Sequence, residues 1–252
     1  MRPPVDSIAA PPFPAGAQWL NSDPLTMDGL RGRPVLLEFW DFCRPNSLHT
    51  LPYLMAWHER YGADGLVVVS VHAPGFRASA NEDALRAAVV RLRIAHPVLL
   101  DTNFALWKDY ENAGWPGRYL WGPDGMLVDY HYGEGAYAEC ERAIGALLEV
   151  EREPLAPLRP EDAPDAVLVV PSEDRLEAPF SGPYEAGAAW AVLDPRGAAD
   201  ACVTANGATI AVEHPGAYEL ERHRVHTAAA LELELGAAVR CDAVCFTPGL
   251  AG

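Results

Sequence analysis

The sequence has little positive charge and no long hydrophobic run, and both absences narrow the classes of protein that it can encode. Only 19 lysine and arginine residues stand against 35 acidic residues, which gives a formal net charge of −16 at pH 7. Nucleic acids and anionic membranes attract positive charge, so neither is expected as a partner. No stretch approaches the roughly 20 apolar residues of a membrane span, and the first residues lack the apolar core of a signal peptide. The expected location is therefore the cytoplasm.

Cysteine is scarce as well. The five cysteines are an odd number without the spacing of a disulfide framework, which agrees with a reducing compartment. The sequence is compatible with Cys202 pairing with Cys241 or Cys245, and equally with all three being buried thiols. Phosphate loops, serine nucleophile elbows and zinc motifs are also missing. No cofactor and no metal site are therefore predicted, and the oligomeric state is not readable.

The first part of the chain is organised around residues 34–61, where a buried strand runs through a short polar turn into a helix. The apolar run 35–40 lacks clean alternation, which is typical of a central strand covered on both faces. Pro45 suits a first helical turn, and the apolar residues at 48–55 follow a helical period. A helix N-terminus at the end of such a strand favours a thiolate or another anion.

This stretch resembles the thioredoxin-like superfamily, in particular the redoxin branch that includes TlpA and the C-terminal region of DipZ. The turn of that branch reads F-W-x-x-x-C-x-x-C followed by L-x-T-L-P-Y, and this chain reads F-W-D-F-C-R-P-N-S-L-H-T-L-P-Y without a gap. The resemblance therefore implies that Arg44 and Ser47 replace the two redox cysteines of the C-x-x-C motif by R-P-N-S. Cys43 lies one residue before the usual nucleophile.

Further residues carry the same resemblance. Glu38 stands at the position of the buried acid of the family, and Gly114–Leu120 resembles the segment with the cis-proline. The resemblance implies that Pro116 faces the turn at residues 43–47. It covers roughly the first three-fifths of the chain, and it bears on the fold more than on the activity.

The expected fold class is an α/β thioredoxin-like fold followed by a small all-β sandwich. We expect a redoxin domain at residues 1–152 that begins with an extended arm at 1–17, a proline-rich linker at 153–165, and a β-sandwich resembling the C-terminal domain of DipZ at 166–252.

Within these domains the patterns predict individual elements. In the first domain the expected elements after residue 61 are a strand at 65–72, a helix at 82–92 capped by Asn81, a strand at 97–101, a short helix at 105–110, a hairpin at 119–132 and a helix at 137–152. In the second the expected strands are 188–193, 201–204, 208–213, 217–221, 229–235 and 239–246, with a hairpin turn at Asn206-Gly207.

The chemistry of the turn has two interpretations. A thiol-exchange catalyst needs an attacking thiolate and a second thiol that resolves the mixed disulfide, whereas the turn supplies only Cys43. The first hypothesis is a one-cysteine thiol oxidoreductase or peroxidase, in which a small thiol, a peroxide or a protein thiol is the substrate. Otherwise Cys43 is an inert, buried small hydrophobe.

The two charged residues beside Cys43 also have alternatives. Arg44 either binds a carboxylate or phosphate at the helix N-terminus, or it faces solvent, or it neutralises Glu38 below it. Glu38 itself is too polar to be buried alone, so it is either paired or a proton acceptor. Cys43, Arg44 and Glu38 are the candidate catalytic residues.

The second hypothesis is a redox-inactive, thioredoxin-fold binding module that uses the groove between Arg44–Ser47 and Pro116. A cis bond at the proline leaves neighbouring backbone free to pair with an extended peptide. His72 follows a strand at the edge where open α/β sheets present ligands, and Trp115 could wall the groove or belong to the core. The candidate groove residues are Asn46, Ser47, His72, Trp115 and Pro116.

Overall fold

The structure, a computed structural model, describes residues 7–252. The predicted arm at residues 1–17 therefore lies partly, over residues 1–6, outside the described range. The chain divides into two compact units: one contains Asn46–Pro74 and Val89–Ala156 with the residues up to Asp41, and the other contains Phe42–Pro45, Gly75–Ala88 and Pro157–Gly252. The boundaries proposed at 152/153 and 165/166 stay predictions.

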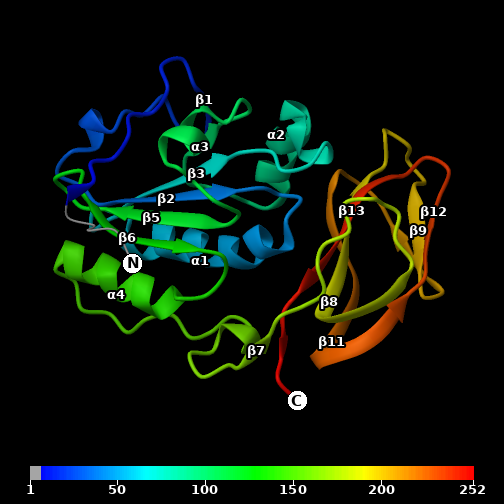
Figure 1. The fold of residues 1–252 in the computed structure, drawn as a ribbon. Coiled ribbons are helices and arrows are strands. Elements are labelled where there is room, and N and C mark those ends of the chain that lie inside the picture. Colours follow the sequence, from blue (N-terminus) through cyan, green and yellow to red (C-terminus); the bar gives the residue numbers. More distant parts are fainter. Residues whose placement is uncertain (1–6) are drawn as a thin grey trace. The chain divides into compact units, whose positions relative to one another are not determined.

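The first unit is built on a six-stranded mixed sheet with the strand order β1-β4-β3-β2-β5-β6 (Figure 1). The three central strands β2, β3 and β4 are parallel, whereas β1, β5 and β6 pair antiparallel to their neighbours. The strands are β1 (Gln18–Leu20), β2 (Val35–Trp40), β3 (Val67–His72), β4 (Val98–Leu100), β5 (Gly117–Trp121) and β6 (Leu127–Tyr132). The predicted central strand at 35–40 is thus confirmed, with all six residues buried.

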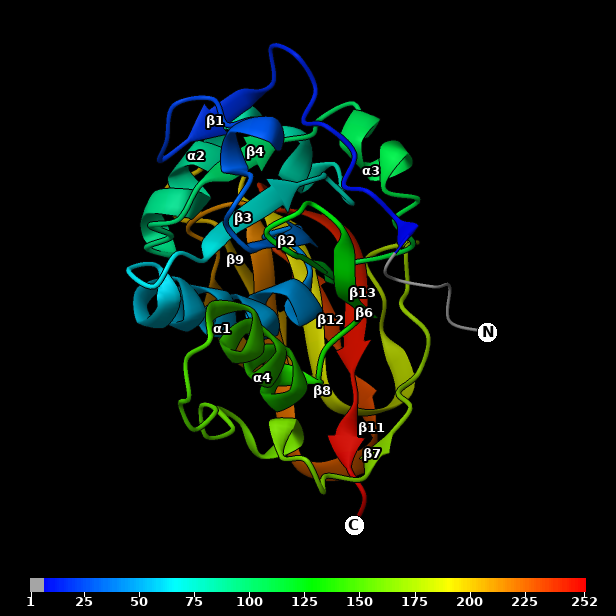
Figure 2. The same cartoon turned by 90° about the vertical axis from the view of Figure 1, so that its left-hand side faces the viewer.

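Helices cover both faces of this sheet. The helices α1 (Pro45–Tyr61) and α4 (Tyr137–Leu148) lie side by side on one face, and α3 (Ala105–Asp109) lies on the other (Figure 1 and Figure 2). A hydrophobic core lies on each face of the sheet, and alternate residues of β2 belong to one or the other. Leu36 packs with α1 and α4, whereas Val35 and Leu37 pack with α3 and the N-terminal segment. Across residues 7–252 we find no helix with the length and apolarity that a membrane crossing needs. The remaining helical elements are α2 (Glu82–Arg91) and 3-10 turns at Asp28–Leu30, Ala78–Ala80 and Pro160–Asp162.

Two helix ends show how local chemistry sets element boundaries. The Asn81 side chain accepts a hydrogen bond from the Ala84 N–H at 3.0 Å, which confirms the predicted cap of α2. The prediction that the last helix extends to residue 152 is wrong, because α4 ends at Leu148. Glu149 adopts the left-handed conformation with φ 55°, which ends the helix.

The second unit contains an all-β region. Two three-stranded antiparallel sheets, β10-β9-β12 and β11-β8-β13, share one hydrophobic core, and β7 pairs with β14. The Asn206-Gly207 turn joins β9 to β10 as predicted, with φ of 46° and 81°. The strands are β7 (Leu168–Val169), β8 (Gly182–Asp194), β9 (Cys202–Ala205), β10 (Ala208–Ala211), β11 (Gly216–Leu231), β12 (Leu233–Leu235), β13 (Arg240–Thr247) and β14 (Gly249–Leu250).

Candidate functional site

The turn after β2 is closed by a hydroxyl group. Ser47 is fully buried in the first turn of α1, and its Oγ accepts a hydrogen bond from the Asp41 backbone N–H at 3.2 Å. This bond fastens the end of β2 to the beginning of the helix. Ser47 therefore has a structural partner in the turn, whereas Asn46 beside it is half-exposed.

Cys43 and Arg44 have different environments. Cys43 forms no disulfide bond with another described residue, and its exposed fraction is 0%. Arg44 is half-buried, and its guanidinium carbon lies 4.5 Å from the centroid of the Phe76 ring, a cation–π contact. In this arrangement a substrate cannot reach the thiol without a local opening of the turn.

Glu38 is buried in the middle of β2, opposite Arg118 of β5 in the strand register. Burial raises the pKa of Glu38 to about 8, and the positive charge of Arg118 opposes part of that rise. Neither carboxylate oxygen has a hydrogen-bond partner among the described residues. Arg118 instead donates through Nη2 to the Gly135 carbonyl at 2.6 Å. Burial therefore favours the protonated, neutral form of the Glu38 carboxyl group.

His72, at the end of β3, is also buried. Its Nε2 lies 3.8 Å from Oδ1 of Asp41, and its ring meets the Trp40 ring edge-on at 5.6 Å. Both His72 and Asp41 are at most 1% exposed. The imidazole thus belongs to the interior of the first unit, although its backbone position at a strand end matches the prediction.

Trp115 forms an aromatic platform with Phe104 and Trp107. The three side chains are half-buried, and the Trp107 and Trp115 rings are 4.3 Å apart at 41°. The Trp115 indole N–H donates to the Ala73 carbonyl at 2.8 Å, which fixes the ring. The Trp115–Pro116 peptide bond is cis, and Pro116 is buried. Half-exposed, immobilised rings beside an extended backbone make a surface for apolar groups of a ligand.

Asp101 supports this aromatic platform, and sequence reasoning missed its part. Its carboxylate accepts hydrogen bonds from the backbone N–H groups of Leu106 at 3.1 Å and Trp107 at 2.8 Å. Asp101 is 2% exposed, so its buried carboxylate satisfies two backbone N–H groups at the beginning of α3 and fixes that end of the helix. An acidic residue four positions before a short helical segment is the signal that could have identified it.

The first three-fifths of the chain has a thioredoxin-like fold. Its sheet and helices superimpose on the crystal structure of a thioredoxin-like superfamily protein with a TM-score of 0.51 and 24% identity, covering 59% of this chain and 100% of that chain. The predicted α/β fold is thus confirmed, as is the all-β region that follows it. No family model matches the chain.

Curated relatives agree with the resemblance seen in the sequence. The chain is 32% identical over 142 residues to DipZ of Mycobacterium bovis, which covers 55% of this chain and 20% of DipZ. It is 34% identical over 143 residues to the chloroplastic protein SUPPRESSOR OF QUENCHING 1 of Arabidopsis thaliana, covering 56% of this chain and 14% of that protein. It is 25% identical to the thiol-disulfide oxidoreductase YkuV of Bacillus subtilis, covering 52% of this chain and 87% of YkuV. The chain thus spans a fifth or less of the length of the first two relatives.

Proposed function

We propose that this chain is a thioredoxin-fold binding module that holds an extended polypeptide segment on the aromatic platform beside Pro116. It does not exchange disulfides by itself. The observation that carries this proposal is the full burial of Cys43, together with Arg44 and Ser47 at the positions of the two redox thiols. A disulfide exchange catalyst needs an accessible thiolate and a resolving thiol, and neither requirement is met at the turn.

The geometry of the aromatic platform supports binding. The Trp115 ring is held by the hydrogen bond from its indole N–H to Ala73 and packs against the Trp107 ring, so these rings lose little freedom when a ligand binds. Tryptophan side chains are the commonest energetic anchors of protein interfaces. The large apolar area of these rings suits the apolar side chains of an unfolded or extended chain.

The test is binding of reduced, carboxymethylated α-lactalbumin, an unfolded polypeptide without free thiols, measured by fluorescence anisotropy. We expect saturable binding that Trp115→Ala weakens roughly tenfold or more, because a central aromatic anchor is lost. Cys43→Ser should bind like the wild type. Val90→Ala, which truncates an exposed apolar residue of α2, is the control, and near-UV circular dichroism checks folding. A Trp115→Ala variant that is folded and binds as tightly as the wild type would contradict the proposal.

The second candidate is a one-cysteine thiol oxidoreductase that uses Cys43. The similarity to YkuV, which is named as a thiol-disulfide oxidoreductase, favours it, as does the position of Cys43 beside a cationic residue. Because Cys43 is buried, this activity requires the turn to open. It predicts that Cys43 is alkylated by iodoacetamide in the native protein at a rate approaching that of a free thiol. The binding module predicts alkylation of Cys43 only after unfolding.

A further inference from the structure

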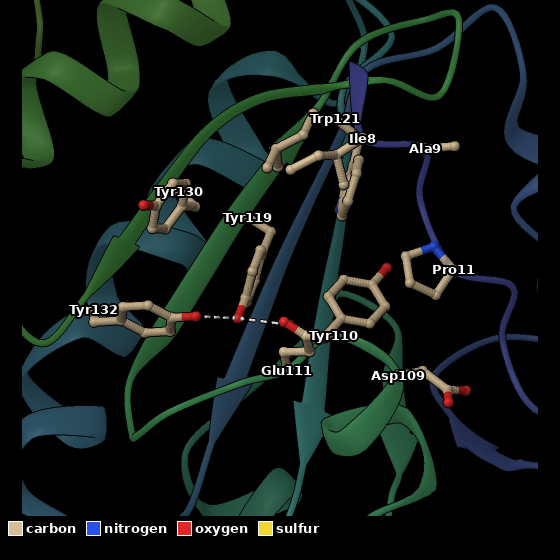
Figure 3. Close-up of a pocket in the computed structure, with 11 residues that line it drawn as sticks. Ile8, Ala9, Pro11, Asp109, Tyr110, Glu111, Tyr119, Trp121, Tyr130 and Tyr132 are labelled. Atoms are coloured by element: carbon tan, nitrogen blue, oxygen red, sulfur yellow. Dashed lines mark hydrogen bonds between the residues drawn. The ribbon is translucent and has the colours of Figure 1, made fainter. Parts of the chain in front are cut away.

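The first unit contains a second concave feature, a pocket of about 410 Å³ walled by aromatic rings (Figure 3). β5 and β6 supply most of these rings, and the chain after α3 supplies another. The rings are those of Tyr110, Tyr119, Trp121, Tyr130 and Tyr132. A volume of several hundred Å³ lined by aromatic groups is the usual size of a site for a small ligand.

The strand pairing explains why so many rings face one side. Tyr119 pairs with Tyr130 across β5 and β6, and Trp121 follows Tyr119 by two residues, so the three side chains share a face of the sheet. A register shift between Leu120 and Trp121 pairs Trp121 with Leu127, which keeps Leu127 on that face too. The aromatic wall is therefore a product of strand alternation and one bulge.

Hydrogen bonds hold the wall in place. The Tyr119 hydroxyl donates to Asn112 Oδ1 at 2.9 Å. It also lies 2.9 Å from the Tyr132 hydroxyl, as Figure 3 shows. The ring of Tyr110 meets that of Tyr119 edge-on, with centroids 5.2 Å apart. Tyr119 and Tyr110 are buried, whereas Tyr132 is 41% exposed and stands at the mouth. The rings are thus pre-organised, and the pocket is open at one side.

The charge of the lining selects the ligand. Asp109 and Glu111 are exposed carboxylates in the lining, and no lysine, arginine or histidine of residues 7–252 lines the pocket. Ring faces carry negative electrostatic potential, so aromatic walls and carboxylates attract the same ligand, an organic cation. An anion would meet repulsion from both. A strongly hydrated primary ammonium would lose more water on entry than a methylated one.

We propose that this pocket binds a methylated ammonium group, such as a trimethylammonium headgroup. The rings of Tyr119, Tyr130 and Tyr132 contact the methyl groups, and the carboxylates of Asp109 and Glu111 supply the counter-charge. The same chemistry occurs in free choline-like molecules and in trimethylated lysine side chains. This inference is independent of the proposed function, because the pocket shares no residue with the aromatic platform.

The test compares choline with dimethylbutanol, in which a neutral tert-butyl group replaces the trimethylammonium, by isothermal titration of the full chain. We expect saturable binding of choline and affinity for the neutral isostere that is lower by roughly tenfold, the contribution of a desolvated cation–π site. A trimethyllysine peptide forms the second arm. Tighter binding of the peptide assigns the site to a protein ligand, and tighter binding of choline assigns it to a small molecule.

Variants locate the binding. Tyr132→Ala removes a ring at the mouth and leaves Tyr119 its hydrogen bond to Asn112, and Glu111→Gln removes an exposed charge. Each should weaken choline binding several-fold. Glu59→Gln, which removes an exposed carboxylate of α1 outside the pocket, should leave it unchanged. The proposal is overturned if the neutral isostere binds as well as choline, if neither choline nor the peptide saturates, or if Tyr132→Ala binds like the wild type.

Discussion

Glu38 is a buried carboxyl group that makes stability depend on pH. In the folded protein burial raises its pKa from 4.5 to about 8, whereas in the unfolded chain it titrates near its ordinary value. Between these pH values the folded state keeps a proton that the unfolded state releases. The free energy of unfolding therefore falls as the pH rises from 4.5 towards 8.

Glu38→Gln has the same shape and no proton to release. We expect this variant to be more stable than the wild type at pH 8, by up to about 4 kcal/mol, and nearly equal to it at pH 4.5. Urea unfolding followed by tryptophan fluorescence measures both values. Glu59→Gln, an exposed carboxylate, is the control and should keep the slope of the wild type. An equal pH slope in Glu38→Gln would show that Glu38 is ionised in the folded protein.

At the residue scale the sequence identified candidate residues such as Glu38 and Cys43, but it did not predict which side chains they contact. Glu38 was expected to be paired or a proton acceptor, and its strand position and burial follow from the apolar run around it. Arg118 was not foreseen, because the register between β2 and β5 joins residues 80 positions apart in the chain. The full burial of Cys43 was one of two open alternatives, since the packing around a turn depends on distant segments.

Among the elements, α3 is short and depends on one carboxylate. Asp101 accepts the N–H groups of Leu106 and Trp107, and with five residues the helix has few bonds of its own. Asp101→Ala leaves two backbone donors without their partner, which should cost about 1–3 kcal/mol of unfolding free energy. Because Trp107 carries the ring that packs on Trp115, the near-UV circular dichroism of the tryptophans should weaken as well.

The matched control for this helix is Asn103→Ala. Asn103 accepts only the Ala105 N–H, at 3.1 Å, and it is exposed, so water replaces it at little cost. Asp101→Asn keeps one carbonyl oxygen, so its loss of unfolding free energy should lie between those of Asp101→Ala and Asn103→Ala. Equal losses for Asp101→Ala and Asn103→Ala in thermal unfolding would mean that the buried carboxylate does not hold α3.

Elements specified by local chemistry were predicted well, whereas one long strand that depends on pairing was predicted as two. The Asn81 cap and the Asn206-Gly207 turn each depend on a few adjacent residues, and both are confirmed. The segments 217–221 and 229–235 were predicted as two strands, whereas β11 runs continuously from Gly216 to Leu231. The polar residues in the middle of β11 interrupt the apolar pattern from which strands are predicted. β11 nevertheless pairs with β8 before and after this polar segment, and the pairing contains two register shifts.

For the whole molecule, the first three-fifths of the chain has a thioredoxin-like fold, and the resemblance to redoxins implies that Arg44 and Ser47 stand at the positions of the two redox cysteines. The strand, turn and helix of residues 35–61 resemble the redoxin pattern, and the Ser47 hydroxyl closes the turn. If the turn retains the backbone geometry of redoxins, two substitutions should introduce disulfide exchange. The helix N-terminus would then stabilise a thiolate at position 44.

We therefore expect Arg44→Cys combined with Ser47→Cys, on a Cys43→Ser background, to form an internal disulfide and to catalyse insulin reduction by dithiothreitol. The rate should exceed that of the unmodified chain roughly tenfold or more, because a resolving thiol follows the attacking one within a single helical turn. Arg44→Cys alone, on the same background, should form mixed disulfides without turnover, since it lacks the resolving thiol. A folded double variant that forms no internal disulfide would mean that the turn has diverged from redoxins in backbone geometry as well as in residue type.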